Sequence, residues 1–183
     1  MQTMKVPDEP RLSLSEWVVL CLICEQPTHG FAVVAALARD SELGQIWYVP
    51  KAVVYRAMDR LEQFGYTRTI GIEPSSRGPV KSLSEATPAG QSTARLWLGR
   101  PVVHPRDVRT ELLIKLALLD RIGVDASELL RRQHALLTPV AAVLTDRLDG
   151  ATGFQHTLAL WRRESISATL RFLEAAGQPV SSP

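Results

Sequence analysis

The strongest constraint on the fold is a change of hydrophobic period between residues 50 and 86. Behind Pro50, which suits a first helical turn, apolar side chains recur at helical spacing at Val54, Ala57, Met58 and Leu61. Gly65 then suits the left-handed cap that ends a helix. Residues 66–72 favour a strand, and the turn-forming stretch 74–79 precedes a return through residues 80–86. The pattern predicts an amphipathic helix followed at once by a two-stranded hairpin.

Two more helices are expected before this one. Residues 13–16 read Ser-Leu-Ser-Glu, the pattern of a capping box, ahead of a helix that ends near Gln26. A second helix should start at residues 28–30 and end within residues 40–44. Its expected apolar face consists of Phe31, Val34, Ala35 and Ala38. Three helices followed by a two-stranded hairpin predict a winged helix-turn-helix.

The rest of the chain is expected to be helical. A helix runs from Thr87-Pro88-Ala89-Gly90 to about residue 98, and Gly99-Arg100-Pro101 marks a boundary. We therefore expect a mainly α fold with a small β-hairpin. Its parts are a flexible N-terminal arm (1–11), a winged-helix DNA-binding domain (12–99), a C-terminal α-helical dimerisation domain (100–177) and a tail (178–183).

Three helices are expected in the C-terminal domain, over residues 107–120, 126–148 and about 154–176. The first carries one apolar face, made of Val108, Leu112, Leu116 and Leu119. The second should open on a capping box between Asp125 and Glu128, and Pro139 should kink or split it.

Basic residues cluster on the predicted third helix and hairpin. The whole chain has a formal net charge of only +2, so a DNA contact would have to come from local clustering. Between residues 51 and 81 six Lys or Arg face three acids. The candidate contacts are Lys51, Tyr55, Arg56 and Arg60 on the helix, and Arg77 and Lys81 on the hairpin. The alternative interpretation is an ordinary solvated face.

Several of these residues occur together in a known family. The order of residues 13–26, His29-Gly30-Phe31, Tyr55 with Arg60-Leu61-Glu62 and Gly65-Tyr66, then Arg77-Gly78 and Thr87-Pro88-Ala89-Gly90 resembles the PadR family of bacterial transcriptional regulators. The resemblance covers residues 12–98 well and the helical remainder loosely.

The resemblance implies a homodimeric repressor of transcription. It places Tyr55 at the tyrosine of the recognition helix and assigns dimerisation to the C-terminal helices. The chain departs from the family at Leu83-Ser84-Glu85-Ala86, where members usually carry aromatic residues and a leucine. It also has Val53-Val54 where smaller or hydroxylated residues are common.

The last helix carries two apolar sides. One seam consists of Leu158, Trp161, Ser165, Ala168 and Phe172, and the other of Ile166, Leu170 and Leu173. The helices of residues 107–148 can cover one seam, and we expect a second subunit to cover the other. Such a homodimer would read a pseudo-palindromic operator in double-stranded DNA. A wholly intramolecular bundle is the alternative.

Trp97 and Trp161 are candidates for a pocket that binds a small aromatic effector, because large aromatic side chains supply stacking area. The alternative is that both tryptophans are core anchors.

Other function classes find little support. Cys21 and Cys24 have dithiol spacing but lie in an apolar helical run, so we interpret them as structural. The four histidines (His29, His104, His134 and His156) form no short ligand spacing, and no metal or other cofactor is expected. The chain has no glycine-rich phosphate loop, nucleophile elbow or paired-carboxylate motif, and we expect no enzyme.

The expected location is the cytoplasm, because no secretion signal or membrane-spanning run is recognisable. The main functional alternative is a non-catalytic helical adaptor that binds other proteins. An adaptor would need an apolar groove, whereas DNA binding needs a basic surface shared by the third helix and the hairpin.

Overall fold

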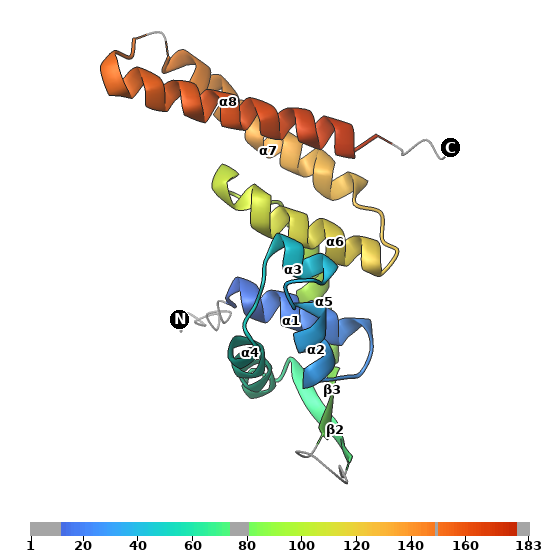
Figure 1. Cartoon of the computed structure of the whole chain (residues 1–183). Helices are drawn as coiled ribbons and strands as arrows, with labels where there is room; N and C mark the ends of the chain where they lie inside the picture. The colour runs from blue at the N-terminus through green and yellow to red at the C-terminus, as the bar shows by residue number, and fades with distance from the viewer. Residues whose placement is uncertain (1–11, 74–80, 149, 179–183) are drawn as a thin grey trace, which may run out of the picture. The chain divides into compact units, whose positions relative to one another are not determined.

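The computed structural model describes residues 12–73, 81–148 and 150–178 (Figure 1). The chain divides into two compact units, of which the first ends at Trp97 and the second begins at Leu98. Most described residues are helical, and the sheet that they contain is small and antiparallel. The predicted mainly helical fold with a small β element is therefore confirmed. Within these ranges no helix combines the length and the hydropathy that crossing a membrane requires.

Helix α1 (Leu14–Glu25) is the centre of the N-terminal unit. Its capping box is present as predicted: Glu16 N donates to Ser13 Oγ at 3.4 Å, and Ser13 N donates to Glu16 Oε2 at 2.6 Å. The helix is apolar on nearly every side, and its central residues Val18, Val19 and Leu20 are fully buried. Helices α2 and α4 and strand β3, whose bounds follow, all contact it.

The segment after α1 differs from the predicted single helix. Strand β1 (Thr28–His29) comes first, then a short α2 (Gly30–Ala36) and a separate α3 (Glu42–Ile46). Because β1 pairs with strand β3 (Lys81–Ala86), the helix starts at Gly30 and buries Val33 and Leu37. The predicted apolar face was wrong: Phe31 and Ala35 are exposed, and Val34 and Ala38 are only half-buried.

Helix α4 (Lys51–Gln63) follows the prediction closely. Val54, Ala57 and Leu61 are buried and Met58 is half-buried. The chain leaves the helix through Gly65, whose φ of +71° is the left-handed conformation expected there.

The hairpin consists of β2 (Thr67–Glu73) and β3, and α5 (Pro88–Leu98) follows it. Strand β1 lies on the other side of β3, so the sheet order is β1-β3-β2 rather than a two-stranded hairpin. The predicted turn, with Arg77, lies outside the described residues.

The C-terminal unit begins with an irregular helical run. A 3₁₀ turn (η1, Pro105–Asp107) leads into a π-helical turn (η2, Val108–Leu112) and then α6 (Leu113–Arg121). A π turn contains more residues than an α turn, so it rotates the inward face relative to a regular helix. Three residues of the predicted apolar face (Val108, Leu112 and Leu119) are buried as expected, while Leu116 is only half-buried. Ile114, Lys115 and Leu118 are buried as well, beyond the prediction.

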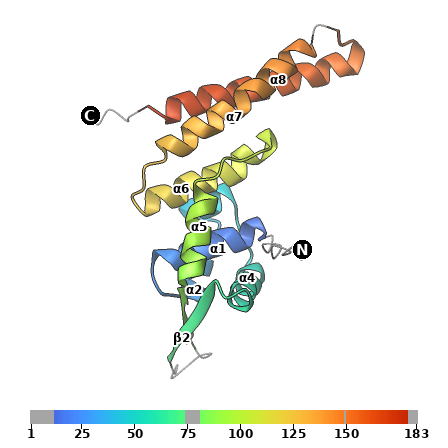
Figure 2. The same ribbon diagram turned by 180° about the vertical axis from the view of Figure 1, so that it is seen from behind.

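Helices α7 (Ser127–Asp146) and α8 (Gly153–Ala176) lie side by side and antiparallel (Figures 1 and 2). Helix α7 continues through Pro139, so the predicted split is wrong; packing along α8 outweighs the lost backbone hydrogen bond. The predicted capping box is also absent. Asp125 accepts from Ser127 N at 3.1 Å, while the Glu128 carboxylate is bound by the Arg131 and Arg132 guanidinium groups.

Candidate nucleic-acid interface

The outward face of α4 has an uneven distribution of charge. Lys51, Tyr55 and Arg56 are exposed in its N-terminal half, and the exposed acids Asp59 and Glu62 lie in its C-terminal half. The N-terminal end of a helix also carries the positive end of the helix dipole. The first turns of α4 are therefore the part best suited to approach a polyanion.

Lys51 and Arg56 have no carboxylate partner within the described part of the chain. The Lys51 ammonium lies 5.9 Å from the centroid of the Tyr55 ring, a cation–π distance. Both positive charges can thus bind an anion without first breaking an ion pair.

Arg60 has a different environment. Its Nη1 lies 3.0 Å from Oε1 of Glu16, whose side chain is only 4% exposed. The guanidinium carbon also lies 5.2 Å from the centroid of the Phe64 ring. Arg60 therefore connects α4 to α1, and this contact was invisible in the sequence because the two residues are far apart along the chain.

The Tyr55 side chain is exposed to solvent on one side and packs against α2 on the other. Its side chain is on the exposed face of α4 and is 38% exposed. The ring also contacts α2 at Gly30, where an added Cβ would lie 2.6 Å from Tyr55 Cε1. Both residues belong to segments that carry the family resemblance, but no local pattern in the sequence connects them.

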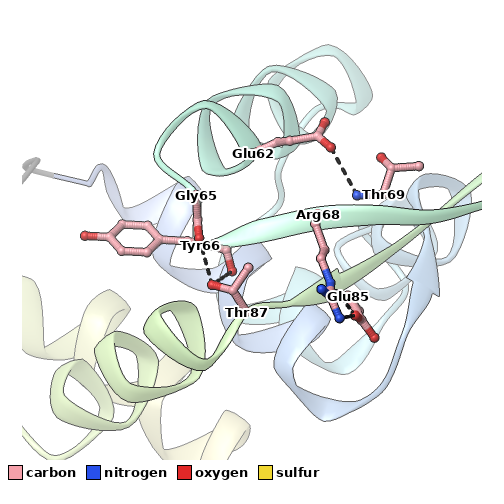
Figure 3. Close-up of polar contacts among 7 residues, drawn as sticks. All are labelled: Glu62, Gly65, Tyr66, Arg68, Thr69, Glu85 and Thr87. Carbon is pink, nitrogen blue, oxygen red and sulfur yellow. Dashed lines mark hydrogen bonds and ion pairs between the residues drawn. The ribbon is translucent and has the colours of Figure 1, made fainter.

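Polar contacts fix the hairpin to the end of α4 (Figure 3). Glu62 Oε1 accepts from Thr69 N at 3.1 Å, which joins α4 to β2. Thr87 Oγ1 donates to Gly65 O at 2.7 Å. The same oxygen accepts from Gly90 N at 3.1 Å, which joins the turn after α4 to the start of α5. These contacts hold the hairpin in a defined position relative to α4.

The structure explains two residues of the Thr-Pro-Ala-Gly sequence that follows the hairpin. Thr87 caps α5, as its contact with Gly90 N shows. A Cβ on Gly90 would lie 2.0 Å from Tyr66 O, so only glycine allows α5 to approach the backbone of Tyr66, just before β2, this closely.

The charges of the hairpin are only partly described. Arg68, counted above in the basic cluster, donates from Nε to Glu85 Oε1 at 2.6 Å across the β2–β3 pair, so its charge is neutralised locally (Figure 3). Lys81 opens β3 opposite Glu73, but its side chain, like all of Arg77, lies outside the described residues.

The two tryptophans proposed for an effector pocket differ in environment. Trp97 is buried in the N-terminal unit and stacks on Trp17, with ring centroids 5.3 Å apart. Trp161 is 70% exposed and lines a cavity of about 1040 Å³ in the C-terminal unit. Val108, Leu144 and Phe172 contribute to the apolar wall of this cavity, and His104, Arg109 and Arg162 contribute polar groups.

The cysteines do not have the environment of a reactive dithiol. Cys21 is buried, and burial raises the pKa of the Cys24 thiol to about 11. Among the described residues no three His, Cys, Asp or Glu side chains come together as a metal site would require.

Similar chains occur among solved structures. The crystal structure of Bacillus subtilis PadR in complex with operator DNA is 19% identical, with a TM-score of 0.47 over 90% of this chain and 97% of that one. The structure of smu.1604c from Streptococcus mutans UA159 is 16% identical, with a TM-score of 0.42 over 88% and 96%. Bacillus subtilis PadR in complex with p-coumaric acid gives 16% identity and a TM-score of 0.42 over 94% and 96%. No protein-family model and no curated protein matches the chain.

Proposed function

We propose that this chain is a sequence-specific DNA-binding transcriptional regulator in which α4 enters the major groove and the β2–β3 hairpin contacts the phosphate backbone. The observation that carries the proposal is the exposed start of α4, where Lys51, Tyr55 and Arg56 lie together without acidic partners in the described chain. The hairpin is bonded to the other end of the same helix.

Five of the six candidate residues contact DNA in this proposal, whereas Arg60 is assigned to the ion pair with Glu16. Lys51 and Arg56 bind phosphates, and Tyr55 reaches base edges. Arg77 and Lys81 extend the basic surface along the hairpin, as the sequence predicts.

The alternative function, a helical protein-binding adaptor, requires an apolar surface instead. The outward face of α4 is charged, and the buried apolar residues of the helix face α1 and the rest of the core. This distribution of charge favours DNA over an apolar protein partner.

The hairpin assignment is tested by changing Arg77→Ala and Lys81→Ala together and measuring duplex DNA binding at several salt concentrations. We expect weaker binding to all sequences and a salt slope reduced by about 0.9 per lost phosphate contact. Arg131→Ala, in the C-terminal unit and paired with Glu128, is the control. An unchanged affinity and slope in the double variant would refute the role of the hairpin.

We further propose a homodimer formed through α8, which would read a pseudo-palindromic operator. Ile166 and Leu173 of one seam are buried within the chain, whereas Trp161 and Phe172 of the other remain exposed. Trp161→Glu should give a monomer in sedimentation and weaken operator binding, because two linked half-site contacts become one. His156→Glu changes another exposed residue of α8 and should remain dimeric; a dimeric Trp161→Glu would rule out this interface.

The cavity at Trp161 is our candidate site for a small aromatic effector that releases a repressor from DNA. Its apolar wall offers stacking, and Arg109 and Arg162 offer positive charge. Titration with planar aromatic acids should quench Trp161 fluorescence and relieve repression of a reporter gene. If no ligand of the panel quenched the fluorescence of the intact protein more than that of a Trp161→Phe control, an effector site here would be contradicted.

A further inference from the structure

We infer that Gly30 is a specificity-determining positioning residue: it leaves the space in which the Tyr55 ring lies against α2, and so sets where that ring meets DNA. This inference rests on the proposed DNA-binding function and deepens it. Gly30 lies on a different element from Tyr55 and is itself buried, so its effect on DNA recognition is exerted through the tyrosine.

The need for glycine at this position is one of space. The φ angle of Gly30 is not in the left-handed region, so its backbone conformation would accept any residue. An added Cβ, however, would lie 2.6 Å from Tyr55 Cε1, 3.2 Å from its Cζ and 3.3 Å from Met58 Sδ. Carbon atoms in favourable contact are about 3.5–4.0 Å apart. One extra methyl group therefore cannot coexist with the present ring position.

The ring is the part that would move. The atoms closest to the added Cβ belong to side chains of α4, and none of the three nearest is backbone. Tyr55 is 38% exposed, so its ring has solvent to move into. A Gly30→Ala variant should therefore keep its fold while displacing the ring, and with it the neighbouring Lys51 ammonium that lies 5.9 Å from the ring centroid.

Gly30 is in turn held by the hairpin. His29, its neighbour in the chain, pairs with Leu83 of β3, and His29 Nδ1 lies 3.1 Å from Ser82 O. The strand pairing fixes where α2 begins, and the start of α2 fixes the space left for Tyr55. The short segment from β1 to Gly30 thus couples the position of the hairpin to the position of the tyrosine.

The DNA test uses the full chain and two probes: a duplex selected by the intact protein from a random-sequence pool, and a scrambled duplex of equal length and composition. Gly30→Ala should lower the ratio of the two affinities by roughly 5- to 150-fold, the loss of one base-specific contact. Tyr55→Ala should lower the ratio similarly. The double variant should be no worse than Tyr55→Ala alone, because the glycine acts through the tyrosine. Gly150→Ala, where an added Cβ meets nothing within 4 Å, is the matched control.

A second arm needs no DNA. Gly30→Ala should lower the thermal midpoint of the intact protein more than it lowers the midpoint of the Tyr55→Ala variant. In the Tyr55→Ala variant, which lacks the ring, Gly30→Ala should leave the thermal midpoint unchanged or raise it, because alanine is a better helix former than glycine.

Two results would overturn the inference: an unchanged affinity ratio in Gly30→Ala, or independent additive effects of the two substitutions in both arms. Failure of the intact protein to select any duplex is a different result, which would overturn the proposed function and this inference with it before any variant is measured.

Discussion

The two carboxylate oxygens of Glu16 make different contacts, and one of the oxygens forms an ion pair with Arg60. Oε2 closes the capping box at the start of α1, whereas Oε1 lies 3.0 Å from Nη1 of Arg60 on α4. Because the Glu16 side chain is buried, its charge is compensated mainly by this guanidinium and by the capping contacts. The pair ties the helix that forms the core to the helix proposed to read DNA.

Arg60→Ala should lower the free energy of unfolding by about 1–2 kcal/mol, because it leaves a buried carboxylate without its cation. The dependence of DNA affinity on salt should stay unchanged, whereas Arg56→Ala should reduce the slope by about 0.9. Chemical denaturation and salt titration of duplex binding measure the two effects. A reduced slope in Arg60→Ala would mean that this residue contacts phosphate after all.

Thr87→Val should lower the free energy of unfolding by about 1–2 kcal/mol. The isosteric change removes both the cap of Gly90 N and the hydrogen bond to Gly65 O, while keeping the shape of the side chain. Thr87→Ser keeps the hydroxyl and should retain most of the stability. Equal denaturation midpoints for the valine and serine variants would show that the hydroxyl contributes little.

Gln133→Leu should lower the stability of the C-terminal unit by about 2–4 kcal/mol. The fully buried Gln133 amide accepts from Val102 N at 2.7 Å and donates to Val102 O at 2.9 Å, so leucine would leave two backbone groups unpaired. Gln155→Leu, at an exposed position of α8, is the control for the change in residue type. A loss no greater than in that control would contradict this account.

Cys24 should react slowly with iodoacetamide in the folded protein. Burial raises its pKa from 9.0 to about 11, so at pH 8 the folded protein holds about a hundredfold less thiolate than the unfolded chain. The rate should rise as pH approaches 11. The folded state also holds the Cys24 proton more tightly than the unfolded chain does. The free energy of unfolding should therefore keep its full value below pH 9 and fall as pH rises from 9 toward 11. Site-resolved mass spectrometry measures the labelling, and equal rates in folded and denatured protein would contradict the shift.

Local signals predicted much of the N-terminal unit. The capping box at Ser13 and Glu16 and the helical period of Val54, Ala57 and Leu61 both lie within a few turns of chain, and both were found as expected. The sequence predicted where α2 starts, but not its early end at Ala36 or the strand β1 before it. Strand β1 exists only through the pairing of Thr28 with Ser84, in a strand distant in sequence.

In the C-terminal unit, the sequence determined that helices would form and that Val108, Leu112 and Leu119 would be buried, but not the whole buried face of α6. The π-helical turn at Val108–Leu112 shifts the buried face of α6, and no local residue pattern announces such a shift. Pro139 gave a strong local signal for a break, yet packing along α8 kept α7 whole.

For the candidate site, the sequence by itself determined which charged and aromatic residues share the outward face of α4, because a helical period fixes direction. Only the tertiary structure decided that Arg60 is held by Glu16, that Arg68 is neutralised by Glu85, and that the Tyr55 ring lies against Gly30. These three pairs join residues on different elements. Their contacts arise when the elements pack, so they are set by the fold as a whole and not by the local order of residues.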